Sequence, residues 1–141
     1  MADWSKGARA AEYMPQKVVT PAVWQTMLNN GWGDKEGYDT LTSDLYLRFL
    51  VEELKPFIDS NYSTNPNRSH TLIMGASMGG LISAYAIAEY PEIYGAAACL
   101  STDWAMSEGA VARWFDDHWP SAGGHRIYFD LGTETYDADY G

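Results

Sequence analysis

The sequence has little cysteine and no long apolar run. Its single cysteine, Cys99, excludes an internal disulfide framework, and the apolar run 96–100 around it predicts a buried strand with a core thiol. No stretch approaches the roughly 18 consecutive apolar residues of a transmembrane helix. The first residues lack a positively charged segment followed by an apolar one. We therefore expect a soluble chain without a signal peptide.

Positive charge is scarce as well. Nine Lys and Arg residues stand against 19 Asp and Glu, which gives a formal net charge of −10. This balance repels phosphate backbones and anionic lipid, so we expect neither a nucleic-acid nor a membrane partner. No Cys/His pair has the spacing of metal ligands, which predicts no metal site. The sequence also has no G-x-G-x-x-G motif and no P-loop lysine, which disfavours a nucleotide site.

The 141 residues form one domain, 1–141, large enough to bury a core. The first forty residues are expected to be irregular, except for a short extended piece at Val18-Val19 and a helix over 21–28. An amphipathic helix is expected from an N-cap at Ser43 to about residue 61, with a kink at Pro56. Strands over 71–74, 95–100 and 125–131 alternate with helices over 78–90 and 107–119. This alternation predicts an α/β fold: a parallel sheet with helices on both faces.

The motif Gly75-x-Ser77-x-Gly79 lies where the first predicted strand ends and the following helix begins. This context is typical of a nucleophile elbow, in which a strained turn projects the serine hydroxyl from the carboxyl edge of a sheet. We expect glycine to be required at both 75 and 79, because a side chain there would collide with backbone. The N–H of Met78, at the helix N-terminus, would then donate to a developing oxyanion.

A serine nucleophile needs a base, and in this fold the chain order is Ser, then Asp or Glu, then His. The loop after the last predicted strand offers Glu134 and Asp137 as the acid, while Asp130 is interpreted as structural. The sequence has three histidines, and all of them precede that loop: His70, His118 and His125. The order rule therefore identifies no base.

The residues around the motif resemble a known family. Ile73–Leu81, the segment 90–95 behind it and Tyr128–Glu134 are similar to the putative esterase family of α/β-hydrolases, which includes feruloyl, acetyl-xylan, esterase D-like and enterochelin esterase-like enzymes. The resemblance covers most of the chain and is most specific around Ser77. Against the family pattern, the chain looks like a partial α/β-hydrolase domain. By this resemblance we expect the chain to begin after the loop that gives the second oxyanion donor and to stop before the catalytic histidine.

The resemblance implies a serine hydrolase that cleaves carboxylic esters through an acyl-enzyme intermediate, without a cofactor. By position, Ser77 corresponds to the nucleophile, Met78 to an oxyanion donor and the loop 134–137 to the acid. Asp103 and Trp104 correspond to a wall of the substrate pocket.

Two alternatives stay open beside the esterase. One is a catalytically impaired hydrolase fragment that lacks its histidine and is stable as an oligomer or binding module. The other is a flavodoxin-like domain that binds an anion at the glycine turn. Because few strands are predicted, unprotected strand edges favour a homo-oligomer. The tryptophans are expected either to stack on a phenolic or sugar ester or to pack in the core.

Overall fold

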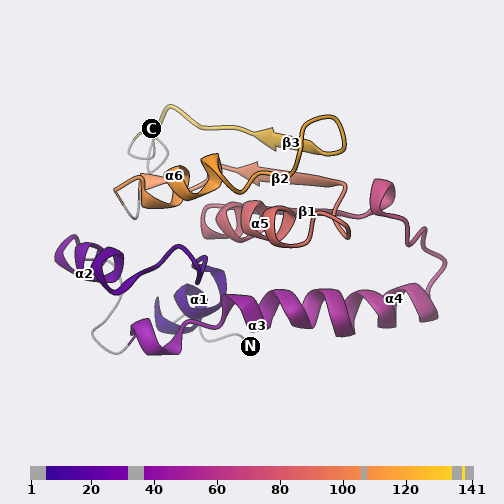
Figure 1. Cartoon of the computed structure of the whole chain (residues 1–141), viewed down its shortest axis with the longest axis horizontal. Coiled ribbons are helices and arrows are strands. Elements are labelled where there is room, and N and C mark those ends of the chain that lie inside the picture. The colour runs from indigo at the N-terminus through magenta and orange to yellow at the C-terminus, as the bar shows by residue number, and fades with distance from the viewer. Residues whose placement is uncertain (1–5, 32–36, 106–107, 135–137, 139–141) are drawn as a thin grey trace.

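Three parallel strands and the helices around them make up the protein (Figure 1). The computed structural model describes residues 6–31, 37–105, 108–134 and 138. The strands are β1 (Leu72–Ala76), β2 (Ala96–Leu100) and β3 (Arg126–Phe129), in the order β1-β2-β3. The α-helices are α1 (Lys6–Tyr13), α2 (Pro21–Asn29), α3 (Ser43–Arg48), α4 (Lys55–Asn61), α5 (Met78–Glu89) and α6 (Ala110–Asp116). Shorter helical pieces are η1 (Gly37–Thr40), η2 (Phe49–Leu54) and η3 (Arg68–His70). The predicted α/β class with a parallel sheet is confirmed.

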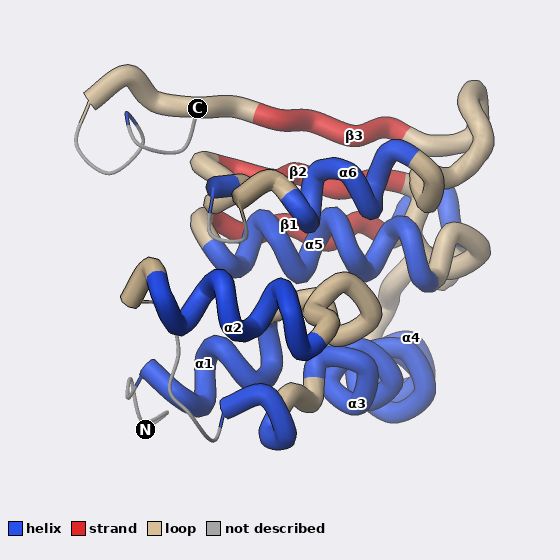
Figure 2. The backbone as a smooth tube through the Cα atoms, turned by 60° about the vertical axis from the view of Figure 1, so that its left-hand side comes forward, coloured by secondary structure: helices blue, strands red, loops and turns tan. Residues whose placement is uncertain are grey.

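The sheet register divides the strand side chains between two faces. Met74 pairs with Ala98, and Ala98 pairs with Tyr128, so these residues share one face. On that face Leu72 and Met74 are each 61 % exposed and Tyr128 is 57 % exposed. Helices α5 and α6 lie together on the opposite face, where Figure 2 shows them in front of the strands. The sequence predicts helices on both faces of the sheet. In the structure, the two helices that connect the strands, α5 and α6, cover the same face.

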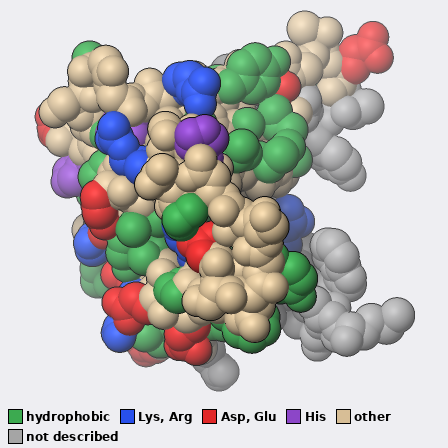
Figure 3. Space-filling model, turned by 90° about the vertical axis from the view of Figure 1, so that its right-hand side faces the viewer, with side chains coloured by type: hydrophobic (Ala, Val, Ile, Leu, Met, Phe, Trp, Pro, Cys, Tyr) green, Lys and Arg blue, Asp and Glu red, His purple; other side chains and the backbone are tan. Residues whose placement is uncertain are grey.

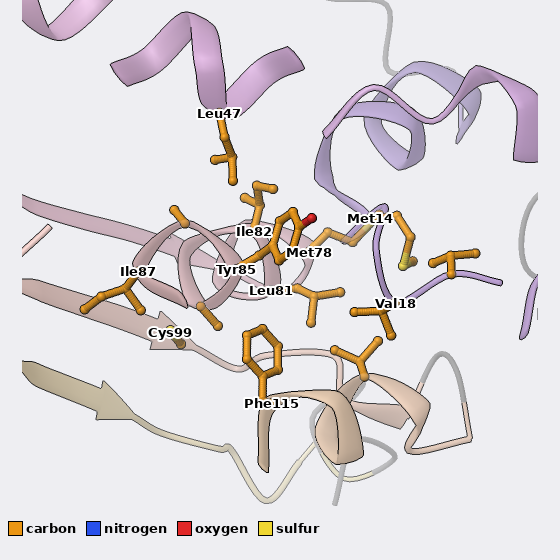
Figure 4. Close-up of a cluster of buried hydrophobic side chains, with 14 of the residues drawn as sticks. Met14, Val18, Leu47, Met78, Leu81, Ile82, Tyr85, Ile87, Cys99 and Phe115 are labelled. Carbon is orange, nitrogen blue, oxygen red and sulfur yellow. The ribbon is translucent and has the colours of Figure 1, made fainter. Parts of the chain in front are cut away.

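Helix α5 is the centre of the hydrophobic core. It is apolar on all sides, and every residue from Gly80 to Ile87 is buried. Side chains reach it from the sheet, from α3, from α6 and from the segment after α1, as Figure 4 shows for Cys99, Leu47, Phe115 and Met14. A helix that is apolar all round has to be covered on all sides, which explains why the other elements surround it.

Cys99 lies in this core with 0 % exposure, so the predicted core thiol is confirmed. Burial raises the pKa of the thiol to about 12, which keeps it protonated and unreactive at neutral pH. The hydroxyl of Tyr85, also in the core, donates to Asp44 Oδ1 at 2.6 Å and so ties α5 to α3. Among the helices of the described residues, none is both long and apolar enough to cross a bilayer.

The predicted helix over 43–61 is present as the continuous succession α3, η2 and α4 (Figure 1). Its middle part, η2, is a π-helical turn in which the Lys55 N–H donates to Leu50 O. Pro56 follows directly and has no N–H to donate, which fits the local shift in hydrogen bonding. The N-cap is Thr42 rather than the predicted Ser43. Ser43 is the first helical residue, and its Oγ instead accepts from the Gln16 N–H at 2.9 Å.

The first forty residues are less irregular than predicted. Helix α1 was not expected, and Val18-Val19 forms no strand. Val18 closes a turn by donating its N–H to Pro15 O at 3.1 Å, and both valines are buried. The predicted helix over 21–28 is confirmed as α2, with the Thr20 side chain as its N-terminal cap.

The open sheet face generates a prediction about assembly. Parallel sheets are normally covered on both faces, and within the described part of the chain β1 and β3 each have a neighbouring strand on one side only. We propose, as the sequence predicts, that the chain associates with itself. Sedimentation velocity at micromolar concentration should show a species larger than the 15.7 kDa chain. A compact monomer over that whole range would contradict the proposal.

Candidate active site

Ser77 occupies a strained backbone turn between β1 and α5. Its φ of 57° and ψ of −123° lie outside the regions that residues with a side chain prefer, so the backbone is strained at this serine. Two hydrogen bonds hold the turn: the Ser77 N–H donates to Leu100 O at 2.9 Å, and Ser77 O accepts from the Leu81 N–H at 3.1 Å. Such strain costs on the order of 1–3 kcal/mol and persists only where the surroundings fix it.

Glycines let the strand and the helix meet this closely. A Cβ at Gly75 would lie 2.4 Å from the backbone carbonyl of Gly79, and one at Gly80 would lie 2.3 Å from Thr102 Oγ1. A Cβ at Gly79 would have nothing within 4 Å. The expectation that Gly79 must be glycine is therefore wrong, and Gly80 takes that role. Gly79 matters only through its backbone, which a side chain at position 75 would overlap.

Ser77 is half-buried at the carboxyl edge of the sheet, and its side chain does not cap α5. Met78 is the first residue of that 12-residue helix, so its N–H has no acceptor within the helix. The positive end of the helix dipole lies at the same point. A negative charge that develops next to the Ser77 hydroxyl would therefore be stabilised by Met78 N–H and by the helix.

The segment after β2 lies beside this turn. Ser101 has a positive φ of 41°, and its N–H donates to Asp130 Oδ1 at 2.8 Å. Asp130, interpreted from sequence as structural, thus links the ends of β2 and β3. Asp103 is buried, at 2 % exposed. Trp104 is half-buried, with its ring 5.7 Å from Phe115 and 5.8 Å from Phe129 between centroids. Substrate contact by Asp103 and Trp104 stays a prediction.

Of the two candidate acids, the structure describes one. Glu134 is exposed in the bend that follows β3, on the same carboxyl edge as Ser77. Asp137 lies outside the described residues. Their role as the acid stays a prediction.

None of the three histidines contacts Ser77 in the structure. His125 directly precedes β3 and His70 lies two residues before β1, so both are at the amino ends of the strands, whereas Ser77 follows the carboxyl end of β1. The five residues of β1 separate the two edges by roughly 16 Å. His118 stacks on Trp114 at 3.8 Å, and its Nδ1 is 2.7 Å from Trp114 O. Within the described residues no hydrogen bond joins Ser77 to a histidine, and no group of three His, Cys, Asp or Glu could hold a metal ion.

Comparison with known proteins identifies the family. Residues 13–138 match the family described as Putative esterase. The chain belongs to the putative esterase family. It is also 28 % identical over 89 residues to a Bacillus subtilis (strain 168) protein described as "Uncharacterized protein YbbA". That alignment covers 63 % of this chain and 35 % of the relative, so the chain spans about a third of it. No solved structure matches the chain.

The span matched to the putative esterase family contains the Ser77 turn, the three described strands and the sequence positions of both candidate acids, Glu134 and Asp137. Sequence reasoning placed Ser77, Met78 and Glu134 on one sheet edge. In the structure Ser77 and Met78 follow the carboxyl end of β1, and Glu134 lies in the bend after β3. Thr102 lies in the loop 101–104 after β2, which by resemblance corresponds to a wall of the substrate pocket. It is buried, and its Oγ1, next to Gly80, has no hydrogen-bond partner among the described residues.

Two alanine variants test how the turn is built. Gly75→Ala should lower the free energy of unfolding by about 2–3 kcal/mol, because the added methyl overlaps the Gly79 backbone. Gly79→Ala, the matched control, should leave stability unchanged or raise it by up to about 0.5 kcal/mol, because alanine favours the helix. Urea unfolding measures both. Equal losses in the two variants would contradict the close approach described here.

Proposed function

We propose that the protein hydrolyses carboxylic esters with Ser77 as the nucleophile of a nucleophile elbow. The observation that carries the proposal is the strained, non-glycine backbone of Ser77 at a strand-to-helix turn, in a chain of the putative esterase family. Strained backbone conformations cluster at functional sites, where the surrounding structure holds them in place. The turn keeps Ser77 at the carboxyl edge of the sheet, next in the chain to Met78, whose N–H has no acceptor within the helix.

The proposed reaction follows from these groups. Ser77 Oγ attacks the ester carbonyl carbon and loses its proton to a base, while the carbonyl oxygen becomes an oxyanion. Met78 N–H donates to that oxyanion, and one such donor is typically worth about 10²–10³ in rate. Collapse of the intermediate expels the alcohol, which takes a proton, and leaves an acyl-Ser77 ester. Water then attacks this ester, releases the carboxylic acid and restores the hydroxyl.

The position of the histidines favours a second candidate, the catalytically impaired hydrolase. A general base must come within hydrogen-bond reach of the serine, about 2.6–3.2 Å. His70 and His125 are held at the opposite sheet edge, and His118 is held by Trp114. A complete site would therefore need a base from elsewhere, for example a partner subunit, oriented by Glu134 or Asp137. Without one, turnover would fall by several orders of magnitude.

Ester hydrolysis tests the proposal directly. The purified chain should hydrolyse p-nitrophenyl acetate above the buffer rate, and Ser77→Ala should abolish the excess. Ser101→Ala is the matched control, because Ser101 also has a positive φ and follows the neighbouring strand at the same edge. It should retain the wild-type rate. Equal loss in both variants, or none in Ser77→Ala, would exclude Ser77 as the nucleophile.

A second experiment locates the base. Combined His70→Gln, His118→Gln and His125→Gln should leave the Ser77-dependent rate unchanged, because none of the three rings contacts Ser77. The same assay measures it, with circular dichroism to verify folding. A folded triple variant without Ser77-dependent activity would contradict this and show that one of these histidines reaches a Ser77, in the same or a neighbouring chain.

A further inference from the structure

At the edge of the sheet opposite Ser77, basic side chains gather in an otherwise acidic protein. A recess of about 580 Å³ lies at the amino ends of the strands. Three basic side chains line it, those of His70, His125 and Arg126. The rest of the lining comes from Ser69 and from the glycines at 95, 123 and 124. No carboxylate is among these lining residues. Figure 3 looks onto this side of the molecule, and Lys, Arg and His side chains lie close together in its upper part.

Arg68 completes the cluster from the turn η3. Its Nη1 is 3.2 Å from His125 Nε2, and its guanidinium is the nearest group to a Cβ placed on Gly124, at 3.5 Å. Gly95 lets η3 pack closely against the start of β2, because a Cβ there would lie 2.3 Å from Arg68 O. Arg68 is not itself part of the recess lining, but its guanidinium lies next to Gly124 and His125, which are.

The donors of this cluster are poorly satisfied. His125 Nε2 is 2.7 Å from Pro91 O, and one ring nitrogen cannot both donate to that carbonyl and accept from Arg68. The shorter contact assigns the proton to Nε2, which leaves Arg68 without an acceptor there. With the proton on Nε2, the buried His125 Nδ1 is an acceptor, and it has no hydrogen-bond partner among the described residues. Arg126 makes one long contact, Nη2 to Ser69 O at 3.4 Å.

The two guanidinium groups also lack counter-charges. Among the described residues the ion pairs are Lys17–Glu89, Arg48–Glu52 and Lys55–Asp59, and none involves Arg68 or Arg126. In a chain with 19 acidic residues and only nine basic ones, these two arginines therefore have no ion-pair partner among the described residues. The net charge of −10 does not prevent anion binding at this point, because salt screens charges farther away than about 8 Å at physiological ionic strength.

We propose that this amino-edge recess binds a doubly charged tetrahedral oxyanion, the phosphate or sulfate group of a small molecule. Arg126 in the lining and Arg68 beside it supply charge-assisted hydrogen bonds. Arginine suits such a group because its planar set of donors matches the oxygen spacing of phosphate. His70 lines the same recess, with its Nδ1 3.0 Å from Ser69 Oγ. The recess is separate from Ser77 and does not depend on the proposed esterase activity.

Titration of the ¹⁵N-labelled chain with inorganic phosphate tests the proposal. The amide signals of Gly123, Gly124 and His125 should shift in a saturable manner. The double variant Arg68→Gln/Arg126→Gln should bind at least about tenfold more weakly, because each lost charge-assisted bond is worth more than a neutral one. Acetate at the same ionic strength should bind more weakly than phosphate, because it carries one charge instead of two.

A charge-matched control separates local contacts from the overall field. Lys17→Gln/Arg48→Gln removes two positive charges elsewhere on the surface and should keep the wild-type affinity for phosphate. All four side chains are at the surface, and the spectra themselves verify that each variant is folded. Shifts that do not saturate, equal responses to acetate and phosphate, or equal weakening in both double variants would each overturn the proposal.

Discussion

The close approach of β1 and α5 at Ser77 is the constraint on which the rest of the structure depends. The chain reverses there with a positive φ at a serine, and it can do so because Gly75 and Gly80 remove the atoms that would collide. The local strain, on the order of 1–3 kcal/mol, is offset by the burial of α5 among the sheet, α3 and α6. The fold thus presents one hydroxyl and one free N–H at the same point.

The two edges of the sheet differ in chemical character. The carboxyl edge carries the candidate nucleophile with acidic neighbours, including Asp130 and Glu134, while Arg68 and Arg126 lie at the amino edge. Because successive parallel strands all run the same way, residues that begin strands gather at one edge and residues that end them at the other. This arrangement explains why His70 and His125 lie far from Ser77, and why an unpaired basic cluster can form in an acidic protein.

From residue 71 onward, sequence reasoning predicted every strand and helix, because apolar runs are bounded there by glycine, proline and polar turns. It missed α1, because Lys6–Tyr13 is stabilised by packing against α3 and α5, and the sequence does not show that packing. It located Ser77 but chose Gly79 instead of Gly80. Residues 75–80 contain three glycines, and the sequence alone does not show which of them contacts a neighbouring segment of the chain. The contact of Asp130 with Ser101 depends on how β2 and β3 pair, which only the fold determines.

The central claim is that the turn holds Ser77 as an activated nucleophile. The most direct measurement is the intact mass of the folded protein after incubation with a fluorophosphonate, which reacts with activated serines and needs no deacylation step. The account predicts one adduct per chain, located on Ser77 by peptide mapping and lost in Ser77→Ala. Folded protein that takes up no label, or takes it up on another serine, would contradict the claim and leave the turn as inherited architecture without its chemistry.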